Sequence, residues 1–184
     1  IFVAFRSGRH FLQIPGPTNV PDRVLRAIDR PLIDHRGPEF VALTEQILEG
    51  LKIVFKTSGP VVVFPTSGSG GWEAALVNTL SPGDRILMFD QGFFANGWQA
   101  VAERHGLQVE ALAQDWRRAV DADELADKLA ADEQHSYRAV LVVHNETSTG
   151  VASDIGAIRA ALQETRHAAL LMVDTVSSLA SIDY

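Results

Sequence analysis

The chain has 184 residues, of which 46% are hydrophobic, and it contains no cysteine. This length suits one domain with a sizeable core, and the lack of cysteine excludes disulfides and favours a cytoplasmic protein. The net charge of −7, with acids and bases interspersed, argues against a nucleic-acid surface, and no stretch reaches the roughly 20 apolar residues of a membrane span.

The first third of the chain predicts an extended arm followed by two helices. We expect residues 1–20 to form an N-terminal arm with a turn at residues 15–17 (PGP), and residues 21–184 to form the body of the protein. A short helix begins at Pro21 or Asp22. The spacing of apolar residues then predicts an amphipathic helix over residues 39–55.

A glycine-rich stretch is the most informative part of the sequence. Residues 61–64 (VVVF) predict a buried strand, residues 65–71 predict a loop with three glycines, and a helix is expected to begin at Trp72. The free amides of such a loop and the positive end of the helix dipole favour an anion. A plain turn between strand and helix, capped by serine, is the alternative. The spacing matches neither a Walker loop nor a G-x-G-x-x-G motif.

Strands and helices alternate along the rest of the chain. Apolar runs predict strands over residues 85–89, 107–112, 138–144 and 169–174. Helices are predicted over residues 98–104, 121–131 and 154–166, and loops over residues 91–97 and 145–150. This alternation predicts an α/β fold with three layers, in which a mainly parallel sheet is covered by helices on both faces.

Several polar and aromatic side chains that could bind a ligand gather at one predicted edge of this sheet. Ligands of such sheets bind beyond the carboxyl ends of the strands. Residues 67–69, residues 91–94, Thr147 and Asp174 all follow or close a predicted strand. Together they offer phosphate donors, an aromatic face, a hydroxyl and a carboxylate. A planar, phosphorylated cofactor with a ring nitrogen would use all four.

Six ordered motifs resemble the class V, fold-type I pyridoxal-phosphate aminotransferases, above all the serine–glyoxylate and alanine–glyoxylate enzymes. The motifs are residues 15–21 (PGPTNVP), 34–36 (DHR), 67–73 (SGSGGWE), 81–84 (SPGD), 144–150 (HNETSTG) and 173–178 (VDTVSS). The resemblance spans most of the chain. It implies that residues 21–184 are the large, cofactor-binding domain of this family, without its C-terminal part and its small domain.

The resemblance implies pyridoxal 5'-phosphate as the cofactor. Ser67, Gly68 and Ser69 would hold its phosphate. Phe94 would stack on the pyridine ring, with Phe93 as the rival candidate.

The remaining implied contacts involve the ring itself. The hydroxyl of Thr147 would touch the ring, and Val176 would pack on the face opposite Phe94. Asp174 would be the catalytic carboxylate that pairs with the pyridinium nitrogen. Ordinary alternatives stay open: Phe94 and Val176 as core residues, Thr147 as the cap of its loop, and Asp174 as the cap of the next turn.

The chain departs from the family pattern at one catalytic group. The family reaction needs a lysine that forms a Schiff base with the cofactor, and this lysine lies beyond the position of Asp174. The lysines of this chain, Lys52, Lys56 and Lys128, lie on predicted helix surfaces and none matches. Because the chain begins with Ile and stops soon after Asp174, we expect a fragment or a truncated form that is inactive alone.

The resemblance implies an activity for the parent protein. An amino acid (serine, alanine or aspartate) would donate its amine to glyoxylate or a similar 2-oxo acid, in a cytoplasmic homodimer without nucleic-acid or membrane partners. Alternatives are another class V enzyme of the desulfurase, kynureninase or phosphoserine aminotransferase type, a lysine-less binding module, and a nucleotide-binding α/β domain. The six histidines show no ligand spacing, so we expect no metal site, and Glu73 is interpreted as a partner of the helix dipole.

Overall fold

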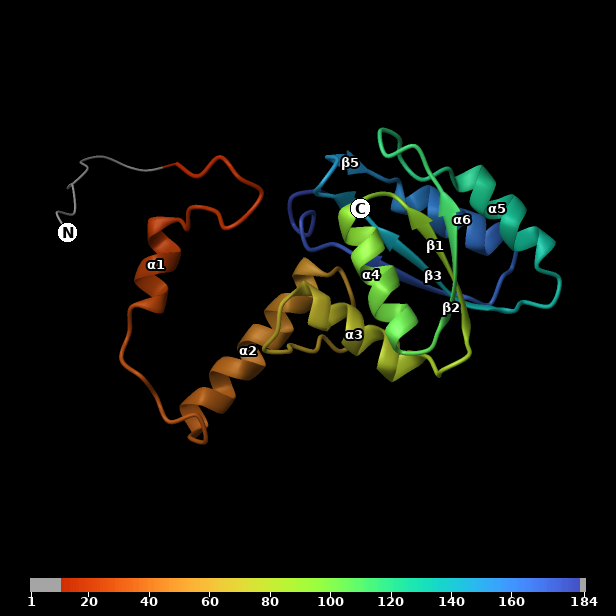
Figure 1. The fold of residues 1–184 in the computed structure, drawn as a ribbon. Helices are drawn as coiled ribbons and strands as arrows, with labels where there is room; N and C mark the ends of the chain where they lie inside the picture. Colours follow the sequence, from red (N-terminus) through yellow and green to blue (C-terminus); the bar gives the residue numbers. More distant parts are fainter. Residues whose placement is uncertain (1–10, 183–184) are drawn as a thin grey trace.

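A computed structural model describes residues 11–182 of the chain (Figure 1). At its centre lies a four-stranded sheet with the order β2-β1-β3-β6. The strands are β1 (Arg85–Asp90), β2 (Gln108–Ala113), β3 (Tyr137–Val143) and β6 (Leu170–Asp174). All three neighbouring pairs are parallel, so the carboxyl ends of the strands lie at one edge of the sheet.

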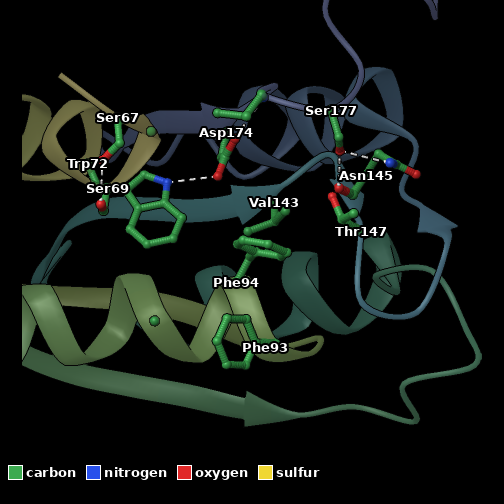
Figure 2. A pocket seen from close by; sticks show the side chains of 13 residues that line it. Ser67, Ser69, Trp72, Phe93, Phe94, Val143, Asn145, Thr147, Asp174 and Ser177 are labelled. Atoms are coloured by element: carbon green, nitrogen blue, oxygen red, sulfur yellow. Dashed lines mark hydrogen bonds between the residues drawn. The ribbon is translucent and has the colours of Figure 1, made fainter. Parts of the chain in front are cut away.

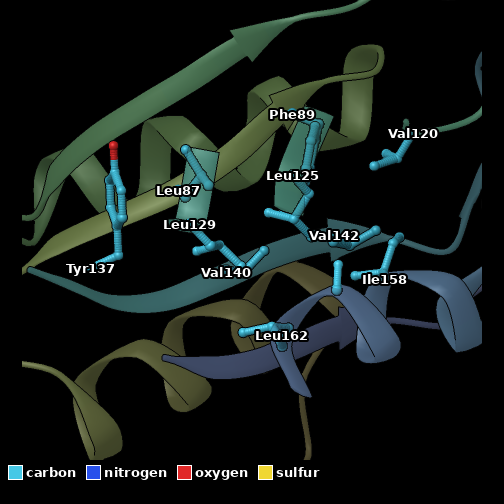
Figure 3. Packing of buried hydrophobic residues seen from close by; sticks show 11 residues of the cluster. Leu87, Phe89, Val120, Leu125, Leu129, Tyr137, Val140, Val142, Ile158 and Leu162 are labelled. Carbon is cyan, nitrogen blue, oxygen red and sulfur yellow. The ribbon is translucent and has the colours of Figure 1, made fainter. Parts of the chain in front are cut away.

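Helices cover both faces of this sheet (Figure 1). Helices α3 (Gly68–Thr79) and α4 (Phe93–Arg104) pack on one face, and α5 (Ala122–Ala131) and α6 (Ile155–Glu164) pack on the other. In β1 the side chains of Ile86 and Met88 face the first pair, whereas Leu87 and Phe89 join the core under α5 and α6 (Figure 3). The three-layer α/β fold with a parallel sheet is therefore confirmed.

Local sequence explains where two of these helices begin. The carboxylate of Asp121 accepts hydrogen bonds from the amides of Asp123 and Glu124 at the start of α5. Asp154 accepts one from the amide of Ala157, 2.9 Å away, at the start of α6. These caps satisfy amides that have no acceptor within the helix, and they confirm the helix starts expected near residues 121 and 154.

The N-terminal part stands away from the sheet (Figure 1). Helices α1 (Asp22–Ile28) and α2 (Pro38–Val54) bury no residue completely, although α2 has the amphipathic pattern expected over residues 39–55. Residues 1–10 of the expected arm lie outside the described residues, and residues 11–20 form no helix or strand. Between residues 11 and 182, no helix is both long and apolar enough to cross a membrane.

The strand expected over residues 61–64 is wrong. These residues form neither a helix nor a strand, and Val62, Val63 and Phe64 are exposed. A strand exists only when its amides and carbonyls pair with a neighbouring strand. No strand within residues 11–182 pairs with this segment, so its β-branched residues do not form a strand despite their preference for β structure.

Three further boundaries differ from the prediction. Helix α3 begins at Gly68 rather than Trp72, so most of the glycine-rich loop is its first turn. Helix α4 begins at Phe93, so the loop expected over residues 91–97 is confined to Gln91 and Gly92. The segment after β3 contains a two-stranded hairpin of β4 (Asn145–Glu146) and β5 (Val151–Ala152) instead of only a loop.

Candidate functional site

A pocket of about 360 Å³ lies at the carboxyl edge of the sheet (Figure 2). Residues from four separate segments line it: the start of α3, the start of α4, the segment after β3, and the end of β6 with the turn that follows. All seven residues that the sequence nominated are among its lining: Ser67, Gly68, Ser69, Phe94, Thr147, Asp174 and Val176. The predicted gathering of these residues is therefore confirmed, whereas their roles stay predictions.

The start of α3 presents unused backbone donors to the pocket. Ser67 occupies the N-cap position, but its side chain caps no helix amide; its hydroxyl lies 2.9 Å from the hydroxyl of Ser69 instead. The amides of Gly70 and Gly71 bond to the carbonyl of Ser67. The amides of Gly68 and Ser69 have no acceptor within residues 11–182. Two amides, two hydroxyls and the helix dipole can therefore receive an anion here.

Close packing explains two of the glycines in this turn. A Cβ atom at Gly68 would lie 3.0 Å from Cγ2 of Val176. At Gly70 it would lie only 2.0 Å from the hydroxyl of Thr66. A side chain at Gly70 therefore has no room beside Thr66, and one at Gly68 would press on Val176, so these two positions of the first turn favour glycine.

Asp174 ends β6 and is held by two donors. Its Oδ2 accepts a hydrogen bond from Nε1 of Trp72 at 2.7 Å (Figure 2), and its Oδ1 accepts one from the amide of Val176 at 2.8 Å. The indole of Trp72 also stacks on Trp98, with ring centroids 6.0 Å apart and planes 14° apart. Sequence reasoning assigned Trp72 no role in this pocket, and no local signal links it to Asp174 because the two residues are 102 positions apart.

Two phenylalanines form the aromatic side of the pocket. The ring of Phe94 is half-buried and lies beside Val143, whereas the side chain of Phe93 is 68% exposed (Figure 2). The two rings meet edge to face, with centroids 5.3 Å apart. Both line the pocket, and the deeper position of Phe94 favours it over Phe93 as the residue that covers a bound ring.

The segment after β3 brings a hydroxyl to the pocket. Within residues 11–182 the hydroxyl of Thr147 makes no hydrogen bond, whereas Thr149 bonds to the carbonyl of Glu146 and to the amide of Val151. Thr149 therefore caps the loop, and the hydroxyl of Thr147 remains available to a ligand. Nearby, Asn145 donates to the hydroxyl of Ser177 at 2.8 Å.

A buried histidine ties the ends of β3 and β6 together. His144 donates its backbone amide to the carbonyl of Asp174 at 2.9 Å, and its Nδ1 lies 2.9 Å from the hydroxyl of Ser178. Burial lowers the pKa of His144, because the charged imidazolium loses its hydration. His144 is therefore neutral at pH 7 and acts as a bridge beneath the pocket.

The other candidate groups lie elsewhere. Glu73 contacts His105, with 3.1 Å between the carboxylate and Nε2, and lies outside the pocket lining. None of the three lysines lines the pocket. Lys52 pairs with Glu49, and Lys128 pairs with Glu110 beside the opposite ends of the strands.

The chain is similar to curated glyoxylate aminotransferases over most of its own length. It is 49% identical over 172 residues to the L-aspartate–glyoxylate aminotransferase of Paracoccus denitrificans. It is 47% identical over 178 residues to the serine–glyoxylate aminotransferase of Arabidopsis thaliana. These alignments cover 93% and 96% of this chain but 43% and 44% of the relatives. The chain thus spans less than half the length of the curated relatives it matches.

Solved structures and a family model agree with this similarity. The fold matches alanine–glyoxylate aminotransferase from Nostoc sp. with a TM-score of 0.85 and 30% identity, over 99% of this chain and 47% of the other. It matches pyridoxamine–pyruvate aminotransferase from Mesorhizobium loti with a TM-score of 0.87 and 27% identity, over 97% and 44%. The family model of aminotransferase class V matches residues 10–184. The chain therefore belongs to the class V aminotransferases, which are enzymes dependent on pyridoxal 5'-phosphate.

Proposed function

We propose that the pocket binds pyridoxal 5'-phosphate, and that the protein to which this chain belongs transfers an amine from an amino acid to glyoxylate or a similar 2-oxo acid. The observation that carries this proposal is that one pocket combines an open helix N-terminus, an aromatic wall, an unused hydroxyl and a carboxylate held by two donors. The names of the relatives support serine or aspartate as the amine donor.

The residues of the pocket fit this cofactor. Its phosphate needs several donors, and the start of α3 offers the amides of Gly68 and Ser69 with two hydroxyls. Its ring nitrogen needs an acceptor, and the carboxylate of Asp174 lies in the same pocket. The cavity of about 360 Å³ lies within the range of roughly 300–1,000 Å³ of small-molecule sites.

Each residue then has one task. Ser67, Gly68 and Ser69 bind the phosphate and fix the position of the ligand. The carboxylate of Asp174 holds a proton on the ring nitrogen, and the cofactor, once bound, supplies an electron sink for the substrate. Phe94 covers the ring and excludes water from it. Val176 lies against Gly68 and forms part of the wall beside the phosphate site.

Thr147 completes the contacts to the ligand. Its hydroxyl has no protein partner within residues 11–182, so it can donate to or accept from a polar ring substituent. Because the Thr147 hydroxyl need not break a hydrogen bond to the protein first, its bond to the ligand adds to the binding free energy.

We further propose that this chain alone does not transaminate. The reaction needs a lysine near the ring, and none of Lys52, Lys56 and Lys128 lines the pocket.

We also propose that the active protein is a homodimer. The apolar side chains of Ile28, Ile53 and Phe64 are exposed, which supports a protein–protein interface over the N-terminal part of the chain. The cytoplasmic location stays a prediction.

The test is a binding titration with matched variants. Pyridoxal phosphate is added to the protein while tryptophan fluorescence is followed, because the ring would bind close to Trp72. Ser67→Ala removes one hydroxyl from the phosphate site and is expected to raise the dissociation constant about fivefold, as for one lost hydrogen bond. Pyridoxal, which lacks the phosphate, should show no such difference.

The control is Ser58→Ala, which changes an exposed serine outside the pocket. Saturable binding that Ser67→Ala weakens and Ser58→Ala does not would support the proposal. Absence of saturable binding, or equal effects of the two variants, contradicts it. Amine transfer from serine, alanine and aspartate to glyoxylate, assayed with the full-length protein, then identifies the donor.

A further inference from the structure

We infer that Glu146 is a positioning residue that fixes the aromatic wall and the free hydroxyl of the pocket through one buried carboxylate, and that it thereby sets the direction in which the cofactor lies. This inference rests on the proposed function, because it concerns how the same pocket holds pyridoxal phosphate. It assigns Glu146 no contact with the ligand.

The carboxylate of Glu146 is fully buried and accepts four hydrogen bonds. Its Oε2 accepts from the amides of Phe94 and Ala95, each at 3.1 Å. Its Oε1 accepts from the amide of Ser148 at 3.0 Å and from the hydroxyl of Ser148 at 2.7 Å. A buried charge with every lone-pair direction satisfied is rigid, because any rotation would break bonds that water cannot replace.

This carboxylate caps helix α4 from a distant part of the chain. Phe94 and Ala95 lie in the first turn of α4, where amides have no acceptor within the helix and the dipole favours a negative charge. The amide of Phe93 is also satisfied, by the hydroxyl of Ser148 at 3.1 Å. The segment around Glu146 and Ser148 therefore replaces the N-cap side chain that Gly92 lacks.

The residue at the N-cap position confirms how tightly these segments meet. Gly92 has a φ of 152°, which side-chain-bearing residues rarely adopt. A Cβ atom on Gly92 would lie 2.7 Å from Cγ of Glu146 and 2.7 Å from the hydroxyl of Ser148. The start of α4 is thus pressed against the Glu146 segment, and only glycine fits between them.

Two pocket residues depend on this contact. The backbone amide of Phe94 donates a hydrogen bond to Glu146. Thr147 lies in sequence between Glu146 and Ser148, which also bond to each other and which we call the clamp. Both side chains line the pocket. If the hydrogen bonds of Glu146 were broken, Phe94 and Thr147 would no longer be fixed relative to each other. The proposed phosphate site on α3 makes none of these bonds and would keep its geometry.

The clamp also selects between two helix N-termini. Both α3 and α4 begin at the pocket, and each start carries a partial positive charge. At α4 the carboxylate of Glu146 already neutralises this charge and uses the amides. Of these two helix starts, only that of α3 has amides left for a ligand. The phosphate must therefore bind at α3, which leaves the ring to Phe94, Thr147 and Asp174.

The experiment compares two ligands in the full-length protein. Dissociation constants are measured for pyridoxal phosphate by fluorescence and for inorganic phosphate by phosphorus NMR. Glu146→Gln keeps the size of the side chain, but its NH₂ group faces a donor at one of the two sides. We expect the constant for pyridoxal phosphate to rise about tenfold and that for inorganic phosphate to change less than about twofold. Near-ultraviolet circular dichroism of the bound ring should weaken in parallel.

The matched control is Glu164→Gln, an exposed glutamate at the end of α6, which should leave both constants unchanged. Equal constants in Glu146→Gln and in Glu164→Gln overturn the inference. So does a parallel loss of affinity for both ligands, because that pattern means general support of the fold. Failure of the unmodified protein to bind pyridoxal phosphate refutes the proposed function instead.

A milder variant keeps the inference testable if Glu146→Gln does not fold. Ser148→Ala removes the hydroxyl that joins Glu146 to the amide of Phe93 and leaves the carboxylate in place. It is expected to raise the constant for pyridoxal phosphate about threefold without changing that for inorganic phosphate. An unchanged constant for pyridoxal phosphate in this variant also contradicts the inference.

Discussion

Replacing Trp72 by phenylalanine tests how Asp174 is held. The indole N–H donates a 2.7 Å hydrogen bond to the carboxylate of Asp174, and the ring stacks on Trp98. Trp72→Phe removes the donor and keeps an aromatic ring. The carboxylate retains its other partner, the amide of Val176 at 2.8 Å, so it is not left without a donor.

The expected loss of stability follows from these contacts. A hydrogen bond to a charged group contributes about 1.5–3 kcal/mol, and the lower end applies because both side chains are only half-buried. The smaller ring reduces the stacking on Trp98 by about 0.5 kcal/mol. Together, Trp72→Phe is expected to lower the free energy of unfolding by about 2 kcal/mol.

The assay is urea unfolding followed by far-ultraviolet circular dichroism. Trp116→Phe provides a matched control, because Nε1 of Trp116 also donates to an aspartate, Asp90, at 3.0 Å, but its side chain is 43% exposed. We expect that control to lose no more than about 0.5 kcal/mol, since water replaces an exposed hydrogen bond. Equal losses in the two variants, with an unchanged dependence on urea, would refute the argument.

Two other changes probe the packing of α3 and a polar cluster below the sheet. Gly70→Ala is expected to cost about 1–3 kcal/mol in urea unfolding, because its Cβ would lie 2.0 Å from the hydroxyl of Thr66. Adding Thr66→Ala should recover part of this loss, and no recovery would contradict the steric explanation. Burial raises the pKa of Asp132, but hydrogen bonds from Tyr137, Ser136 and His167 outweigh it and hold the pKa at about 2, below the ordinary 3.8. The charged form therefore stabilises the fold above about pH 4, and this contribution is lost as the pH falls towards 2. The stability gap between the unmodified protein and Asp132→Asn, measured by urea unfolding, should be largest above pH 4 and shrink towards pH 2; a constant gap contradicts this.

Apolar runs made the sheet predictable. Successive side chains of a strand, such as Ile86 and Leu87, face opposite helical layers. Because both faces of the sheet are buried, each strand needs a continuous apolar stretch. The position of the pocket followed from the same reasoning, because parallel strands deliver their carboxyl ends to one edge.

The failures have a common cause in contacts between distant residues. The segment over residues 61–64 has the composition of a strand, but a strand needs a partner that composition cannot reveal. The start of α4 contains Asn96 and Gly97, which are weak helix formers, and its cap is Glu146 from another segment. The contact of Trp72 with Asp174 likewise joins distant positions.

The strand order has a consequence for how the protein is made. Each new strand joins the edge of the sheet already present: β2 beside β1, then β3 on the other side of β1, and finally β6 beside β3. The growing chain can therefore add these four strands outward from β1 as it leaves the ribosome, since none of the four inserts between two others. The glycine-rich turn of α3 is synthesised before β6 and Asp174, so the proposed phosphate site leaves the ribosome ahead of the carboxylate proposed to pair with the ring nitrogen.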